Sequence, residues 1–158
     1  MKQAFFLDTR DKPGLLIALM HALAGNAHLA LEGNRDRMSE MDFDKIPGAK
    51  EGIVPPFRSE WDENARFVVL PLESDSIPLI LHEILPKGRI VHDLGAIQIE
   101  NNGEIQFLAG DNFHRECVSV GRGVPEQLLK SLVASGILRA YYSTQDGTGE
   151  IIRKMSGR

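Results

Sequence analysis

The stretch that decides the fold is residues 66–107, which reads RFVVLPLESDSIPLILHEILPKGRIVHDLGAIQIENNGEIQF. The apolar residues 67–70 predict a short strand. A helix after Ser76, a candidate N-cap, is predicted by apolar residues at helical spacing, namely Ile77, Ile80, Leu81, Ile84 and Leu85. Pro86 and Gly88 end this helix. The stretch therefore begins as a strand followed by an amphipathic helix.

The second half of the same stretch predicts a strand and a hairpin. Apolar and polar residues alternate from 97 to 100, as they do in a strand with one buried face. Asn102-Gly103 then leads into the strand residues 105–107, which is the strongest short-range signal for a two-residue hairpin turn.

The strand–helix–strand pattern occurs twice more, over residues 4–32 with a helix after Pro13 and over residues 114–142 with a helix from Pro125. The repetition predicts an α+β fold with a ferredoxin-like βαββαβ core, an antiparallel sheet carrying its helices on one face. The hairpin strand and a third, C-terminal βαβ unit would extend this core or begin a second layer. A doubly wound parallel sheet is the alternative, but the alternation at 27–32 and 97–100 disfavours strands that are buried on both faces.

A length of 158 residues indicates a single domain. We expect a first βαβ unit at 1–33, a second unit with the hairpin at 65–110, a third unit at 111–143 and a mobile tail at 144–158. The loop insertion at 34–64 is far longer than the usual loop of about 4–6 residues. Because it carries Phe43, Phe57 and Trp61, we expect it to fold back onto the body or to grasp a protein partner.

Composition limits the classes of partner. The 18 basic and 22 acidic residues give a net charge of −4, which argues against a nucleic-acid-binding surface. No apolar run approaches the roughly 20 residues of a membrane span, and the N-terminal apolar run is too short for a signal peptide, so the cytoplasm is the expected compartment. An open sheet leaves strand edges that need cover, which favours a homo-oligomer.

Residues 5–16, FFLDTRDKPGLL, with the helix that continues to Ala24, resemble the opening of ACT domains. These small regulatory modules have a βαββαβ fold, and many bind amino acids. If the second βαβ unit is included for its order of strands and helix alone, the resemblance extends to Glu100. The 34–64 insertion interrupts it. It implies a non-enzymatic regulatory domain that binds an amino acid or another small carboxylate.

The turn that carries this resemblance is also a candidate ligand site on physical grounds. A helix N-terminus presents unpaired N–H groups and a partial positive charge. Asp11, Lys12, Gly14 and Leu15 would form the site, with backbone amides from Gly14 onward as donors and Lys12 adding charge. Capping of the helix alone explains the same residue types, so this alternative stays open.

Residues 111–117, DNFHREC, are the densest run of reactive side chains. They suggest a third function, a small enzyme with acid–base residues Asp111, His114 and Glu116. In the strand predicted over 116–120, His114 and Cys117 point to opposite faces, so they are not a local pair, and a lone cysteine is most often a small buried residue. His114 and Glu116 share a face, which leaves a metal or acid–base role open for these two residues.

Other motifs predict neither a cofactor nor a metal site. The one cysteine excludes an intramolecular disulfide and a site of several thiolates. No His-x-x-x-His or Cys-x-x-Cys spacing occurs, so a metal ion would need ligands from distant segments. Gly121-Arg122-Gly123 is a weak anion-site signal for which a simple turn is the better explanation.

Overall fold

The computed structural model describes residues 3–36, 38–52, 64–90, 94–144 and 151–154. Three helices occur in these ranges: α1 (Lys12–Leu23), α2 (Ile77–Ile84) and α3 (Glu126–Ala134). The strands are β1 (Gln3–Thr9), β2 (Ala27–Asn34), β3 (Lys50–Glu51), β4 (Ala65–Leu72), β5 (Leu94–Asn101), β6 (Glu104–Ala109), β7 (Val118–Gly121), β8 (Leu138–Thr144) and β9 (Ile151–Lys154). The helices predicted after Pro13, Ser76 and Pro125 are thus confirmed.

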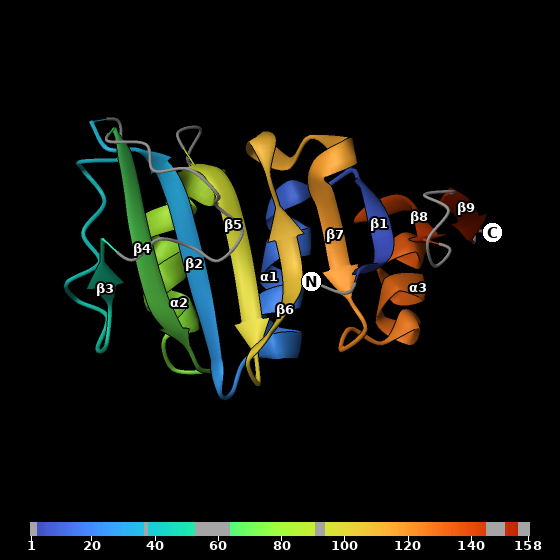
Figure 1. Ribbon diagram of the computed structural model, residues 1–158, viewed down its shortest axis with the longest axis horizontal. Helices are drawn as coiled ribbons and strands as arrows, with labels where there is room; N and C mark the ends of the chain where they lie inside the picture. Colours follow the sequence, from blue (N-terminus) through green and yellow to red (C-terminus); the bar gives the residue numbers. More distant parts are fainter. Residues whose placement is uncertain (1–2, 37, 53–63, 91–93, 145–150, 155–158) are drawn as a thin grey trace.

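The nine strands form one open sheet in the order β3-β4-β2-β5-β6-β7-β1-β8-β9. Each neighbouring pair is antiparallel, and all three helices lie behind the sheet in the view of Figure 1. The predicted α+β class with an antiparallel sheet is confirmed. The alternative of a doubly wound parallel sheet is wrong, because the half-buried strands pair as their alternating sequences indicate.

Two units of the sheet repeat the same connection. Helix α2 joins β4 to β5, which lie on either side of β2, and helix α3 joins β7 to β8, which lie on either side of β1. Each of these two helices therefore crosses one antiparallel strand. Helix α1 instead joins β1 to β2 across the three strands β5, β6 and β7. A ferredoxin-like core has one strand between such partners, so that specific arrangement is not confirmed. The third unit extends the sheet.

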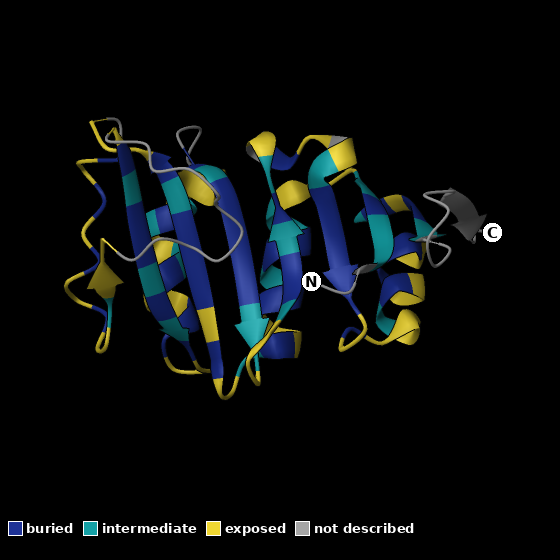
Figure 2. Cartoon of the chain, in the orientation of Figure 1, coloured by how far each residue is buried: buried dark blue, intermediate teal, exposed yellow. Residues whose placement is uncertain are grey.

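One hydrophobic core lies between the helices and the facing side of the sheet. Helix α1 buries its leucines at helical spacing, and Leu29 of β2 lies between Leu70 of β4 and Ile99 of β5 in register. Burial follows the inner strands, and exposed residues gather at the turns (Figure 2). The β5–β6 hairpin turns through Asn102 and Gly103, whose φ angles of 53° and 83° are those expected of Asn-Gly.

The described part of the 34–64 insertion folds back onto the body. Its apolar side chains, Met38, Met41, Phe43 and Ile46, join the core, and Phe43 is only 1% exposed. Phe57 and Trp61 lie outside the described residues. Most of the predicted mobile tail also lies outside them. Its described residues 151–154 form β9, which pairs with β8. No helix among the described residues is long and apolar enough to cross a membrane.

Candidate functional site

The predicted ligand site at the start of α1 forms a helix cap. Asp11 is the N-cap residue, and its Oδ1 accepts a hydrogen bond from the Gly14 amide at 3.0 Å. The Leu15 amide donates to the Asp11 carbonyl at 3.0 Å, and the Leu15 side chain is fully buried. A Cβ on Gly14 would clash with the Asp11 carboxylate, so the glycine serves the cap. A ligand at these two amides would have to displace acceptors within the chain.

Asp111, His114 and Glu116 lie in the β6–β7 connection, on two short 3-10 turns, Asp111–Phe113 and Arg115–Cys117. The strand predicted from Glu116 begins at Val118, so that prediction is wrong for its first two residues. His114 and Cys117 are therefore not on opposite faces of a strand. The structure brings ligand atoms of Asp111, His114 and Cys117 within 4.8 Å of one another. Glu116 contributes its backbone amide, which donates to His114 Nδ1 at 3.3 Å.

Gly121-Arg122-Gly123 forms a turn around a buried side chain. The Gly123 amide donates to Oε1 of Gln106 at 2.8 Å, and Gln106 is 6% exposed. A Cβ on either glycine would come within 3 Å of Gln106. The glycines are needed for this close approach, and the turn interpretation is confirmed.

A cavity at the N-terminal end of β4 was not anticipated from the sequence. Its volume is about 380 Å³. Its described lining combines two arginines and a carboxylate with a hydroxyl and an apolar wall: Arg35, Ser39, Glu51, Gly52, Ala65, Arg66 and Phe67. The β2–β4 register, which pairs Gly33 with Arg66 and Asn34 with Ala65, brings Arg35 close to the start of β4.

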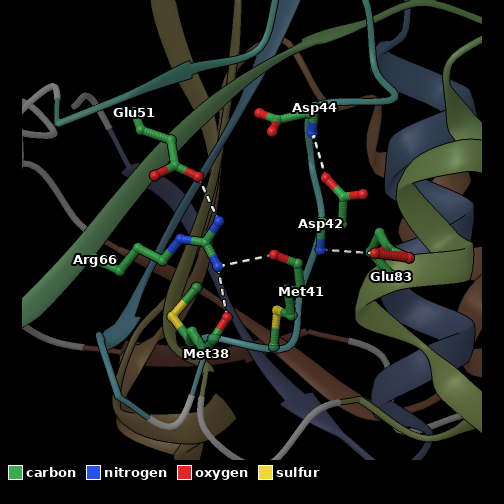
Figure 3. A network of polar contacts seen from close by, with 7 residues as sticks. All are labelled: Met38, Met41, Asp42, Asp44, Glu51, Arg66 and Glu83. Atoms are coloured by element: carbon green, nitrogen blue, oxygen red, sulfur yellow. Dashed lines mark hydrogen bonds and ion pairs between the residues drawn. The ribbon is translucent and has the colours of Figure 1, made fainter.

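Arg66, which lines this cavity, is the centre of a network of polar contacts (Figure 3). Its guanidinium donates to the carbonyls of Met38 and Met41, the latter at 2.9 Å, and pairs with the Glu51 carboxylate. It also lies 5.3 Å from the ring centroid of Phe43. The Arg66 side chain is only 14% exposed, so its charged hydrogen bonds are largely shielded from water and hold the 38–51 segment against β4.

Glu83 of α2 anchors the same segment at a second point. Its Oε1 accepts from the Asp42 amide at 2.8 Å, and Oδ1 of Asp42 accepts from the Asp44 amide at 3.0 Å (Figure 3). Burial raises the pKa of Glu83, but hydrogen bonds from His82 and the Asp42 amide, together with the charge of Lys45, outweigh it and lower the pKa below the ordinary 4.5. The segment is thus fixed to both the sheet and a helix.

The described lining of the cavity differs in charge from the chain as a whole. Its two arginines and one glutamate sum to one positive charge, whereas the whole chain carries −4. Arg66 is largely engaged by carbonyls and Glu51. The Arg35 side chain is exposed, and its Nη2 donates a long hydrogen bond to the Ala65 carbonyl at 3.5 Å. Arg35 is therefore the cation best placed to meet an anionic ligand.

Comparison of the chain with protein-family models, curated proteins and solved structures found no match.

Proposed function

We propose that this protein is a small-molecule-binding regulatory domain that holds an amino acid or another small carboxylate in the cavity beside Arg35 and Arg66. The observation that carries the proposal is that an exposed arginine, Arg35, and a half-exposed carboxylate, Glu51, line the same cavity. This function agrees with the expectation from the ACT-like opening. We assign the ligand to the cavity because the amides of Gly14 and Leu15 already have acceptors.

The lining matches the two charged ends of an amino acid. A guanidinium binds a carboxylate through two parallel hydrogen bonds, which Arg35 can offer. Glu51, with a side chain 49% exposed, can accept an ammonium group while it stays paired with Arg66. Ser39 Oγ donates to the Asp36 carbonyl at 2.7 Å, which leaves its lone pairs as acceptors for the ligand.

The size of the cavity also suits a small ligand. Its volume of about 380 Å³ is near the lower end of the roughly 300–1,000 Å³ range of ligand pockets. Phe67 and Ala65 give the lining its apolar share, and both residues are nearly fully buried. A compact amino acid or short dicarboxylate fits these limits better than a nucleotide.

A thermal unfolding screen tests the proposal. The panel contains the common amino acids, their amides, succinate and citrate. A ligand at 100 times its Kd stabilises the folded state by about 2.7 kcal/mol, which raises the Tm of a chain of this length by about 5–10 °C. Amidation of the ligand carboxylate should abolish the shift, because the guanidinium then loses its anionic partner.

Matched charge variants locate the site. Arg35→Gln should remove the ligand-induced shift. Arg139→Gln removes the same charge from β8, where Arg139 pairs with Asp8 at 3.3 Å, and should leave the shift intact. A shift lost in Lys12→Gln but kept in Arg35→Gln would place the ligand at the start of α1. No shift with any panel compound would refute the proposed function.

A further inference from the structure

We propose that Asp111, His114 and Cys117 form a binding site for a divalent transition-metal ion of the Zn²⁺ class, with the remaining coordination position open to water. The carboxylate, imidazole and thiol ligand atoms lie within 4.8 Å of one another. This inference does not depend on the proposed ligand cavity, which is built from other residues.

The ligand types select the class of metal. Sulfur and imidazole nitrogen favour Zn²⁺, Co²⁺ and related borderline ions, whereas Ca²⁺ and Mg²⁺ prefer sites made only of oxygen. Three protein ligands with one open position is the arrangement of exchangeable and catalytic zinc sites. Asp111 and His114 are exposed and Cys117 is partly exposed, so an ion can enter from solvent.

The backbone holds the three residues in place before any ion binds. The Gly110 amide donates to the Cys117 carbonyl at 2.8 Å, and the Cys117 amide donates to the His114 carbonyl at 2.7 Å. Phe113, 6% exposed, anchors the turn in the core with its ring 6.3 Å from that of Phe107. Asp111 and Phe113 adopt positive φ angles of 46° and 65°, which this closed loop enforces.

Small side-chain movements complete the geometry. Tetrahedral bonds of about 2.0–2.3 Å to zinc place ligand atoms about 3.5 Å apart. The present separation of up to 4.8 Å is closed by rotation of the exposed Asp111 and His114 side chains. Coordination through Nδ1 of His114 would replace the long, exposed 3.3 Å hydrogen bond from the Glu116 amide, whereas coordination through Nε2 would leave that bond in place.

Cobalt titration of the full chain tests the site, with Co²⁺ alone as the probe. The chain has one cysteine, so a thiolate-to-cobalt charge-transfer band reports on Cys117 and on no other residue. We expect the band to saturate at one equivalent of Co²⁺ and to disappear when Zn²⁺ is added. Cys117→Ser should abolish it.

The other ligands are tested by affinity. His114→Gln and Asp111→Asn should each weaken Co²⁺ binding by about tenfold or more, since loss of a direct ligand costs at least as much as loss of an outer-shell partner. His21→Gln, which removes an exposed histidine from α1, should leave the affinity unchanged.

Alkylation of wild-type protein gives a readout that needs no cysteine variant. Zn²⁺ should protect Cys117 from iodoacetamide, and His114→Gln should reduce that protection. Absence of both the band and the protection in folded protein would overturn the proposal. Binding that is insensitive to both His114→Gln and Asp111→Asn would also overturn it, because Cys117 would then be acting alone.

Discussion

Replacement of Arg66 by methionine is expected to loosen the 38–51 segment and to destabilise the whole chain. Methionine keeps an unbranched apolar stem of similar length and removes the guanidinium. The carbonyls of Met38 and Met41 lose their shared donor, and Glu51 loses its partner. Because this segment contributes buried side chains to the core, its release exposes apolar surface that the wild-type protein covers.

The magnitude follows from the contacts. Hydrogen bonds to a charged group are worth about 1.5–3 kcal/mol each when deleted singly. The half-exposed pair with Glu51 adds under about 1 kcal/mol, and the contact with the Phe43 ring adds about 0.5–1 kcal/mol. These terms overlap, since all act on one segment, so we expect a total loss of about 3 kcal/mol. With a urea m-value of about 2 kcal/mol/M, the unfolding midpoint should fall by about 1.5 M.

Urea unfolding of wild type, Arg66→Met, Arg66→Lys and Glu51→Gln gives the comparison. Lysine keeps the charge but cannot reach three acceptors at once, so it should lose about half as much stability as methionine. Glu51→Gln should cost under about 1 kcal/mol. If Arg66→Met costs no more than Glu51→Gln, the guanidinium does not hold the segment and the reasoning is refuted.

Three further predictions address packing and titration. Gly121→Ala should destabilise the chain by about 1–3 kcal/mol in urea unfolding, because the new Cβ would lie 2.5 Å from Oε1 of buried Gln106. Glu83→Gln should be less stable than wild type at neutral pH. The difference should vanish as pH falls through the depressed folded-state pKa of Glu83, below 4.5, because the wild-type advantage exists only while the carboxylate is ionised. The pKa of Tyr141 is raised to about 12 by burial and by its hydrogen bond to Glu126. An absorbance titration should therefore show one tyrosine that ionises at unusually high pH, and Tyr141→Phe should remove that step. The stability that the neutral Tyr141 hydroxyl contributes is complete below the ordinary pKa of 10 and is lost toward pH 12.

Gly121→Ala has a matched control, and each of the three predictions has an outcome that would contradict it. Gly95→Ala adds a Cβ whose nearest neighbour is 3.8 Å away, so it should change stability by less than about 0.5 kcal/mol. Equal losses from the two alanine variants would show that close approach to Gln106 is unimportant. A Glu83→Gln difference that persists in acid would remove the role of ionisation. Ionisation of both tyrosines at the ordinary pKa would contradict burial of the Tyr141 hydroxyl.

Local patterns were sufficient to predict the helices and the hairpin. Apolar spacing after Pro13, and Asn102-Gly103 between two alternating runs, depend only on residues near one another in sequence. The strand order could not be predicted in this way, because it depends on which distant strands pair. Nothing in the periodicity indicates that α1 must cross three strands.

The two candidate sites differ in how far the sequence predicts them. Arg35 and Arg66 become neighbours through the β2–β4 register, which no linear motif records. Asp111, His114 and Cys117 do have a visible signal, three ligand types at intervals of three residues. Asp111 and His114 are predicted as a site from the sequence, but the strand predicted from Glu116 separates Cys117 from them. The backbone instead closes through Gly110, with positive φ values at Asp111 and Phe113.

The central functional claim, that carboxylates bind beside Arg35, is tested most directly by NMR of the side-chain Nε–H groups of arginine. Isotopically labelled protein is titrated with the panel of amino acids and dicarboxylates at millimolar concentration, the range of weak specific ligands. We predict a saturable shift of the Arg35 resonance with at least one compound, while the backbone amides of Gly14 and Leu15 stay in place. Saturable shifts at those two amides with Arg35 unmoved, or no shift anywhere, would contradict the claim.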